Sequence, residues 1–435
     1  MANAREAAMK ILMDVTKNGA YVNLALSRGL ESTALEEADR GFVTQLAYGT
    51  VENLSAIDGV ISSLSKIKMK KISPPILAIL RLGVYQILYL DKVPKSAAVN
   101  EAVKLARRYG HAASAGFVNA LLRAAAKGAE GAAGGSAEIA AAKGGAKAGL
   151  GDAVADAAGR FSYPLWLAKR WEDEFGADFA LSLMAPQGAP EIFIRVNPLK
   201  TTPEALLQQI KAEKTDTEGV LVYKDGPISK SEAFAGGLFS VQDKAFGHVA
   251  RAVGPKPGQR VLDACAAPGG KTCHLAELMQ NQGEIVAFDV HEHKIKLIQE
   301  NARRLGITIV KALCQDASVF VPELEEGFDA VLLDVPCSGL GVIRRRPDLK
   351  QNRAPEDFES LNAAQRSILE ACWRYVKPGG VLVYATCTFE KCENGDMVRW
   401  FIEKHPAFTI VEEKQFFPHI DHTDGMYYCK MIRNN

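Results

Sequence analysis

The sequence predicts a multidomain fold: an all-α N-terminal domain, a small α+β module, and a C-terminal α/β domain built on an open, mainly parallel sheet. Three observations support this prediction. Apolar residues recur at helical spacing through residues 1–123, alanine and glycine dominate residues 124–159, and short apolar runs alternate with helical stretches through residues 253–435. At 435 residues, the chain is long enough for two or three domains with their own cores.

The composition, 48% hydrophobic and 24% charged, is that of an ordinary globular protein and not of a disordered or fibrous one. No apolar run approaches the roughly 20 residues of a membrane-spanning helix, and the N-terminus lacks the apolar core of a signal peptide. We therefore expect a cytoplasmic monomer that does not contact a membrane. All eight cysteines lie at or after Cys265 and none forms a CxxC pair, so we expect neither a disulfide framework nor a metal site.

Charge is distributed unevenly along the chain. Residues 1–128 carry 17 Lys and Arg against 10 Asp and Glu, a net charge of +7, whereas the whole chain carries +1. A basic N-terminal part favours a polyanionic partner, but a solvated helical surface explains the same charges equally well. The basic cluster in residues 66–71 allows the same two interpretations.

Residues 1–123 form the predicted helical domain. A helix is expected over residues 76–90 because its apolar positions recur at helical spacing. It begins behind Ser73, a capping serine, with Pro74 and Pro75 in its first turn. The domain resembles the antitermination factor NusB and the NusB-like RNA-binding domains, which implies their fold and, through it, RNA binding. The resemblance rests on residues 39–42, 80–86, 98–103 and 117–123.

Two further segments separate this domain from the C-terminal one. Of the 36 residues in 124–159, 25 are Ala or Gly and none is aromatic. This segment has almost nothing to bury and is predicted to be a flexible linker. Residues 160–252 combine an expected helix after Pro164, a strand over residues 191–197 and a helix that starts at Thr202. They predict a small α+β module without a catalytic constellation.

The C-terminal region, residues 253–435, alternates apolar runs with helical stretches. This alternation predicts an open α/β sheet that binds ligands at the carboxyl ends of its strands. Every chemically suggestive residue follows one of the runs. The predicted strands are residues 260–263, 284–288, 309–313, 328–333 and 381–384.

A glycine-containing turn follows the first of these strands and opens a helix. It lets a ligand approach the backbone closely and offers helix N-terminal amides to an anionic group. Asp289 ends the second strand, where a carboxylate commonly binds ribose hydroxyls, and Asp316 follows the third, where it could accept a hydrogen bond from an adenine amine. Each Asp alone could be an ordinary loop residue, but together they favour a nucleoside-containing cofactor. The predicted cofactor-binding residues of the turn are Cys265, Ala266, Ala267, Pro268, Gly269, Gly270 and Lys271.

Two cysteines follow what we expect to be neighbouring strands of the sheet. Cys337 lies three residues after Asp334, and Cys387 lies three residues after Tyr384. A thiol that can add to a ring carbon, a second thiol beside it and a cofactor turn suggest covalent alkylation of a pyrimidine. A buried apolar thiol is the alternative interpretation of Cys387.

Three segments, residues 263–272, 334–345 and 384–394, resemble the signature motifs of the RsmB/Sun and NOL/NOP2 family of S-adenosylmethionine-dependent RNA 5-methylcytosine methyltransferases. With the NusB-like part, the resemblance covers the whole chain except the Ala/Gly linker and points to the RsmB/Sun type. It implies a Rossmann-like methyltransferase domain over residues 253–435, S-adenosyl-L-methionine as the cofactor, and small-subunit (16S) ribosomal RNA as the substrate.

The resemblance also implies roles for single residues. Cys387 would be the nucleophile that adds to C6 of cytosine, and Cys337 would assist release of the product. Asp334 would contact the base and also belong to the cofactor site. Val335 and Thr388 depart from the family's usual alanine and serine, but neither change removes a functional group.

The sequence therefore predicts a 16S rRNA cytosine-C5 methyltransferase. In the loop after Cys337, Arg344, Arg345 and Arg346 could contact RNA phosphates, or could form a solvated loop. Two alternatives remain: a cytosine-C5 methyltransferase that acts on tRNA or DNA, and a non-catalytic NusB-like RNA-binding or assembly factor. The presence of both Cys337 and Cys387 argues against the non-catalytic alternative.

Overall fold

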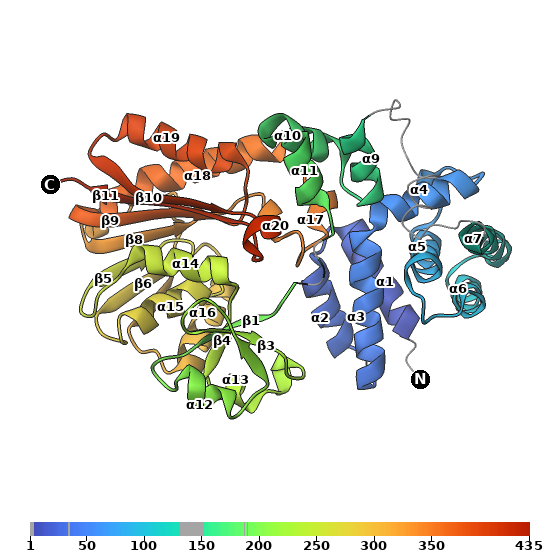
Figure 1. Cartoon of the computed structure of the whole chain (residues 1–435), viewed down its shortest axis with the longest axis horizontal. Helices are drawn as coiled ribbons and strands as arrows, with labels where there is room; N and C mark the ends of the chain where they lie inside the picture. Colours follow the sequence, from blue (N-terminus) through green and yellow to red (C-terminus); the bar gives the residue numbers. More distant parts are fainter. Residues whose placement is uncertain (1–3, 34, 131–151, 187, 189) are drawn as a thin grey trace. The chain divides into compact units, whose positions relative to one another are not determined.

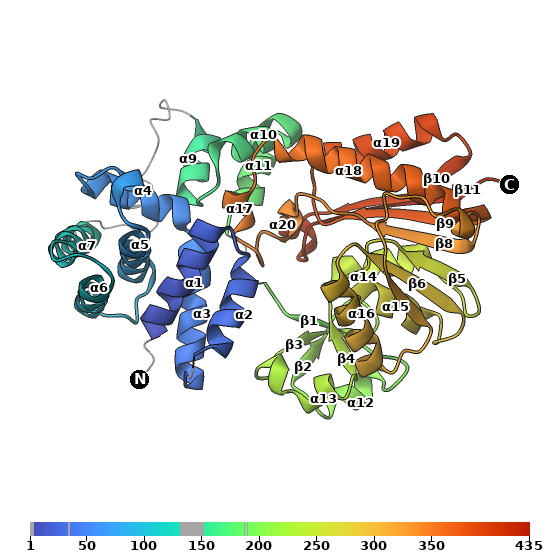
Figure 2. The same ribbon diagram turned by 180° about the vertical axis from the view of Figure 1, so that it is seen from behind.

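The computed structural model describes residues 4–33, 35–130, 152–186, 188 and 190–435. The chain forms two compact units, and it leaves and re-enters the second of them (Figures 1 and 2). Unit 1 comprises Met1–Pro186 and Arg345–Arg353, and unit 2 comprises Gln187–Arg344 and Ala354–Asn435.

The described part of unit 1 is built from helices. Helix α5 (Pro74–Tyr89) is central and confirms the helix predicted over residues 76–90. It is buried on most sides because five helices pack against it, which explains its nearly continuous apolar sequence. These are α1 (Ala4–Asn18), α3 (Glu37–Glu52), α4 (Leu54–Leu64), α6 (Lys95–Tyr109) and α7 (Ser114–Glu130). The same region contains α2 (Val22–Glu31) and the short helix η1 (Met69–Lys71).

The start of α5 differs from the prediction. Ser73 occupies the position before the helix, but its side chain makes no capping hydrogen bond, so the predicted cap is wrong. Pro74 and Pro75 have no backbone N–H, and therefore two of the amides that usually need a partner at a helix start do not exist.

The helices after the Ala/Gly-rich segment belong to unit 1. Helices α9 (Ala153–Arg160), α10 (Leu165–Phe175) and α11 (Ala177–Met184) pack against one another there. The helix expected at the start of the 160–252 module is thus α10, but it folds with the helical unit. Trp171 of α10 is fully buried. Of the predicted linker, α7 and α9 cover the two ends, and residues 131–151 lie outside the described residues.

A second stretch of chain, Arg345–Arg353, completes unit 1 and contains α17 (Leu349–Asn352). Lys350 Nζ donates a hydrogen bond to the carbonyl oxygen of Phe161 at 3.1 Å and lies 4.0 Å from the ring centroid of Tyr163. Burial lowers the pKa of Lys350 to about 8. A segment that follows the Cys337 motif in sequence is therefore held within the helical unit.

Unit 2 begins with a small antiparallel sheet in the order β2-β3-β1-β4. The strand and helix predicted at residues 191–197 and after Thr202 are confirmed as β1 and α12. Thr202 Oγ1 caps α12 by accepting a hydrogen bond from the Ala205 amide at 3.3 Å. The elements are β1 (Phe193–Val196), α12 (Pro203–Leu207), β2 (Ala212–Lys214), β3 (Val220–Tyr223), η2 (Ile228–Lys230), α13 (Glu232–Ala235) and β4 (Phe239–Val241).

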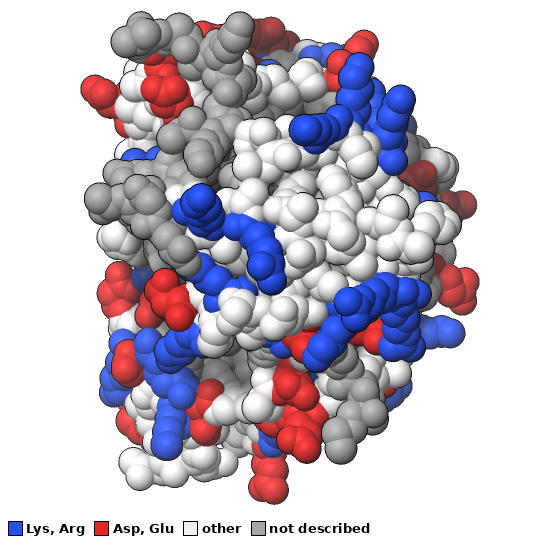
Figure 3. Space-filling view, turned by 90° about the vertical axis from the view of Figure 1, so that its right-hand side faces the viewer, with Lys and Arg blue, Asp and Glu red and all other residues white. Residues whose placement is uncertain are grey.

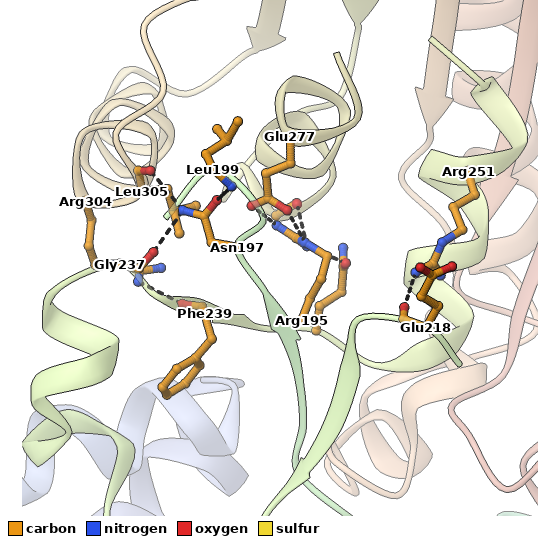
Figure 4. Close-up of polar contacts among 12 residues, drawn as sticks. Arg195, Asn197, Leu199, Glu218, Gly237, Phe239, Arg251, Glu277, Arg304 and Leu305 are labelled. Carbon is orange, nitrogen blue, oxygen red and sulfur yellow. Dashed lines mark hydrogen bonds and ion pairs between the residues drawn. The ribbon is translucent and has the colours of Figure 1, made fainter. Parts of the chain in front are cut away.

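Buried polar contacts join the small sheet to helices of the larger domain within unit 2 (Figure 4). Arg195 of β1 forms a two-point ion pair with Glu277 of α15 (Gly270–Leu278) at 2.7 and 2.8 Å, and both side chains are almost fully buried. Asn197 Nδ2 donates to the carbonyl oxygens of Gly237 and Leu305, each at 2.9 Å. Loss of either ion-pair partner would leave the other charge buried and uncompensated, so this contact fixes how the small sheet docks.

The larger sheet of unit 2 has seven strands in the order β10-β11-β9-β8-β5-β6-β7. The five predicted strands are confirmed, and they pair in parallel. They are β5 (Arg260–Asp263), β6 (Glu284–Asp289), β7 (Val310–Cys314), β8 (Phe328–Asp334) and β9 (Val376–Thr386). Two strands that the sequence analysis missed, β10 (Phe408–Phe416) and β11 (Met426–Arg433), are antiparallel and extend the sheet beyond β9.

Helices cover both faces of this sheet (Figures 1 and 2). Val261 and Leu332 share one core with the helices of the first face, and their strand neighbours Leu262 and Leu333 share another with those of the second. Burial on both faces explains why the strands read as continuous apolar runs. The first face carries α14 (Lys244–Val253), α15 and α16 (Glu292–Leu305), and the second carries α18 (Asp357–Cys372) and α19 (Gly395–Lys404). Shorter helices of unit 2 are η3 (Pro322–Leu324), η4 (Leu340–Val342), η5 (Trp373–Tyr375), η6 (Lys391–Glu393) and α20 (Pro418–Asp421).

Candidate active site

The predicted cofactor turn lies between β5 and α15, at the carboxyl edge of the large sheet. Gly269 has a φ of +100°, and a Cβ there would lie 3.1 Å from the Cα of Ile298. Both the backbone conformation and the limited space therefore favour glycine. Thr272 Oγ1 donates a hydrogen bond to Asp263 at 2.7 Å, and burial raises the pKa of Asp263 to about 7. The turn leads directly into the N-terminus of α15, where backbone amides lack helical partners and suit an anionic group.

Two carboxylates follow the neighbouring strands β6 and β7 at the same edge of the sheet. Asp289, at the end of β6, pairs in register with Cys314, which precedes Asp316 by two residues. Asp289 accepts a hydrogen bond from the amide of His291 at 3.0 Å. Asp316 accepts from the hydroxyl and the amide of Ser318 at 2.7 and 2.8 Å, and these bonds lower its pKa. Asp316 is therefore an ionised acceptor at neutral pH.

Lys271 links the turn to the end of β8. Its Nζ lies 2.6 Å from Asp334 Oδ2 and 4.4 Å from the ring centroid of Phe246. Lys271 is predicted to bind the cofactor only because it belongs to the turn. Its position in the first turn of α15 could have predicted an ion pair. The helix dipole disfavours a cation at that end of a helix unless a carboxylate lies beside it.

The two cysteines predicted to react are in contact. Cys337 follows β8 and Cys387 follows β9, which are adjacent parallel strands with Asp334 paired in register with Ala385. The two sulfur atoms lie 3.3 Å apart. The hydrogen bond that Cys337 shares with Cys387 and the burial of the site raise the pKa of Cys337, so this thiol holds its proton at neutral pH. The prediction of neighbouring strands is confirmed, and the chemical roles stay predictions.

The three predicted RNA-contact residues lie where the chain passes from unit 2 to unit 1. Arg344 belongs to unit 2, whereas Arg345 and Arg346 belong to unit 1, and all three side chains are half-buried. The Arg346 guanidinium lies 3.9 Å from the ring centroid of Tyr21 and 4.0 Å from Asp348. Arg346 thus has partners within the protein, and RNA contact stays a prediction for all three.

The part of the chain that the structure describes contains neither a metal-binding cluster nor a membrane-spanning helix. No group of three or more His, Cys, Asp or Glu side chains is placed there to hold a metal ion. None of the helices in that part combines the length and apolar character needed to cross a membrane. All eight cysteines are free thiols, and Cys273, Cys372 and Cys429 are buried.

Similarity to known proteins extends over 99% of the chain. The model of the 16S rRNA methyltransferase RsmB/F matches residues 250–432, that of the NusB family matches residues 2–127, and that of the RsmF/B-like ferredoxin-like domain matches residues 163–227. The probable ribosomal RNA small subunit methyltransferase B of Bacillus subtilis is 38% identical, over 99% of this chain and 98% of its own. The chain belongs to the RsmB/F family. Ribosomal RNA small subunit methyltransferase B of Vibrio vulnificus is 30% identical, over 99% of each chain.

Solved structures agree with membership of the RsmB/F family. The crystal structure of PH0851 aligns with a TM-score of 0.81 and 28% identity, over 99% of this chain and 98% of its own. A methyltransferase homologue from Pyrococcus horikoshii aligns with a TM-score of 0.57 and 27% identity, over 65% of this chain and all of its own. The predicted fold class is confirmed: a NusB-like helical domain, a small module and a Rossmann-like methyltransferase domain. The predicted enzyme class, a methyltransferase, is confirmed with it.

Proposed function

We propose that this protein transfers a methyl group from S-adenosylmethionine to C5 of a cytosine in 16S ribosomal RNA, through a covalent bond between Cys387 and C6. One observation carries the proposal: two thiols in contact at the carboxyl ends of adjacent parallel strands. Full-length relatives named small-subunit ribosomal RNA methyltransferases support this acceptor.

The donor set at the sheet edge suits S-adenosylmethionine. The N-terminal amides of α15 fit a carboxylate, Asp289 fits ribose hydroxyls, and the ionised Asp316 fits an adenine amine. We infer that the turn from Cys265 to Lys271 holds this cofactor together with Asp289, Asp316 and Asp334. The bound cofactor would supply a methyl group carried on a sulfonium.

Asp289→Ala is expected to weaken S-adenosylmethionine binding by roughly 1.5–3 kcal/mol, because charge-assisted hydrogen bonds to the ribose are lost. RNA affinity should be nearly unchanged. Isothermal titration calorimetry measures the effect, with Asp396→Ala on the exposed side of α19 as the matched control. Equal affinity of the wild-type and Asp289→Ala proteins would identify Asp289 as an ordinary loop residue.

The chemistry needs more than one side chain because C5 of cytosine is a weak nucleophile. Addition of Cys387 Sγ to C6 moves electron density to C5, which then takes the methyl group. A proton held between the carboxyl group of Asp334 and N3 of the base would favour the addition, because it neutralises the negative charge that the addition places on the ring. Afterwards a base removes the proton from C5, the C5–C6 double bond re-forms, and Cys387 leaves. Cys337, whose sulfur lies 3.3 Å from that of Cys387, is placed to assist this release.

The target cytosine must be unpaired or turned out of its stack before Cys387 can reach C6. We infer that unit 1 helps to hold the RNA in that state. Figure 3 looks onto unit 1 from the side of α6 and α7, where Lys and Arg side chains stand in separate groups around a broad uncharged area.

Replacing Lys68, Lys70 and Lys71 with glutamine is expected to weaken RNA binding and to reduce its dependence on salt. All three side chains are exposed. Each phosphate that is no longer neutralised lowers the magnitude of the logarithmic salt slope by about 0.7–0.9, so the slope should fall by about 2–3. RNA affinity across a salt series measures this. Charge substitutions are preferable to removal of the domain, which would also uncover Lys350.

The matched control for this triple substitution removes three exposed lysines of unit 2, at Lys211, Lys230 and Lys256. It should leave the salt slope close to that of the wild-type protein. Equal slopes for both triple variants would show that the basic cluster does not contact RNA.

Incubation of the purified protein with methyl-labelled S-adenosylmethionine tests the acceptor. Label is expected in 5-methylcytosine of 16S rRNA, whereas an equal amount of tRNA should remain unlabelled. Bisulfite sequencing of the product then identifies the cytosine. Label in tRNA alone would show that tRNA, and not 16S rRNA, is the acceptor. The absence of label from both RNAs would contradict the proposed activity.

A further inference from the structure

A cluster of buried polar side chains joins the loops that carry Cys337 and Cys387, and the proposed chemistry does not use it. Gln365 lies in α18 and Glu393 lies in η6, and both side chains are fully buried. A buried carboxyl group costs free energy unless its hydrogen bonds compensate. The hydrogen bonds of Gln365 and Glu393 therefore indicate what this buried pair does.

The pair holds the peptide groups on both sides of Cys337. Gln365 Nε2 donates to the carbonyl oxygen of Pro336 at 3.0 Å and to Glu393 Oε1, also at 3.0 Å. The amide of Ser338 donates to the same Glu393 oxygen at 2.9 Å. The residue before Cys337 and the residue after it are thus both attached to one buried Gln–Glu pair.

Glu393 is in turn attached to the strand that carries Cys387. Its carbonyl oxygen accepts a hydrogen bond from the hydroxyl of Tyr384, a fully buried residue of β9, at 2.7 Å. The hydroxyl groups of Ser338 and Thr388, which each follow one of the cysteines, lie 2.9 Å apart. The loop of Cys337 is therefore positioned from the strand and loop of Cys387.

Burial raises the pKa of Glu393, while the hydrogen bonds from Ser338 and Gln365 oppose the shift. The donors to this carboxyl group are neutral, so it is not held by an ion pair such as that of Lys271 and Asp334. What the pair provides is directional hydrogen bonding to the backbone on either side of Cys337.

We propose that Gln365 and Glu393 are positioning residues that hold Cys337 against Cys387 for the release step. This inference rests on the proposed function. In that step a base takes the proton from C5, the electron pair of the C–H bond becomes the C5–C6 double bond, and the C6–S bond breaks with its pair on Cys387. Misplacement of a group by about 1 Å slows such a step by up to about 100-fold.

Gln365→Met tests the proposal because it keeps the volume of the side chain and removes both donated hydrogen bonds. We expect formation of the RNA adduct at close to the wild-type rate and decay of the adduct slower by about 10- to 100-fold. Cofactor affinity should not change. Ser367→Ala, an exposed change on the same helix, is the matched control and should decay at the wild-type rate.

Three further variants separate positioning from general destabilisation. Glu393→Gln keeps an acceptor for Ser338 and should decay within about threefold of the wild-type rate, whereas Glu393→Ala should resemble Gln365→Met. In a Cys337→Ala protein, Gln365→Met should cause no additional slowing, because the group that it positions is absent. The proposal would be overturned if Gln365→Met slowed adduct decay as much in the Cys337→Ala protein as in the wild-type protein. It would also be overturned if Glu393→Gln and Glu393→Ala slowed adduct decay equally.

The outcomes also distinguish this inference from the proposed function. Absence of any adduct from both wild-type and Cys337→Ala proteins would reject the proposed function itself. Adducts that form normally and decay at the wild-type rate in Gln365→Met would reject only the positioning role.

Discussion

Cys387→Ala is expected to abolish methyl transfer, by roughly 10⁴-fold or more, while S-adenosylmethionine binding persists. The side chain supplies the only covalent bond proposed between protein and base, and without addition at C6 the ring cannot attack a methyl sulfonium. Its place directly after β9, with Sγ 3.3 Å from that of Cys337, motivates the assignment. Transfer of labelled methyl groups to 16S rRNA measures activity, and calorimetry measures cofactor affinity.

The matched control for this variant is Cys392→Ala, which removes another partly buried thiol of the same region. It should retain activity. Substantial turnover by purified Cys387→Ala protein would refute the assignment of the nucleophile. Joint loss of activity and cofactor binding in Cys387→Ala would instead indicate damage to the fold.

Cys337→Ala is expected to convert the enzyme into one that traps its substrate. Cys387 can still add to C6, but release of the methylated base slows, so a covalent RNA–protein adduct accumulates. The raised pKa of Cys337 means that its thiol holds a proton at neutral pH, so it can donate that proton to the departing Cys387 sulfur but cannot be the base at C5. A denaturing gel with labelled 16S rRNA should show a slower band for Cys337→Ala and little for the wild-type protein.

The double variant Cys337→Ala/Cys387→Ala provides the control for the adduct, because it has no nucleophile at this site and should give no slower band. The reverse pattern, with adduct from Cys387→Ala and none from Cys337→Ala, would mean that the two cysteines exchange their proposed roles.

Of the two missed strands, β11 has a buried apolar run, but β10 shows where local sequence patterns stop being informative. β10 contains Glu412, Glu413 and Lys414 within a largely exposed stretch, so it lacks the apolar run by which β5 to β9 are recognised. β10 pairs with β11 because it lies at the edge of the sheet, and its own pattern of apolar and charged residues does not predict this pairing. An edge strand with charged side chains is common in proteins because it limits unwanted pairing with other chains.

The boundary of the helical unit has a similar explanation. The periodicity of α10 correctly predicts a helix, but periodicity does not specify which core receives its apolar face. Packing with α9 and α11 places Trp171 in unit 1. Arg345–Arg353 also packs in this unit, against residues far away in the sequence. No local sequence pattern around the arginines predicts this packing.

The sequence by itself determined the features that depend on short stretches of chain. These are the helical periodicity of α5, the apolar runs of the five parallel strands, the glycine turn, and the cysteines after two of those strands. Only the tertiary structure decided which groups meet: Lys271 with Asp334, Cys337 with Cys387, and the pair of Gln365 and Glu393 with the backbone around Cys337. Local propensity acts through neighbouring residues, whereas these contacts depend on strand order and on helix packing across the sheet. A buried Gln–Glu pair in particular resembles any polar residues of a surface helix until the packing that buries it is known.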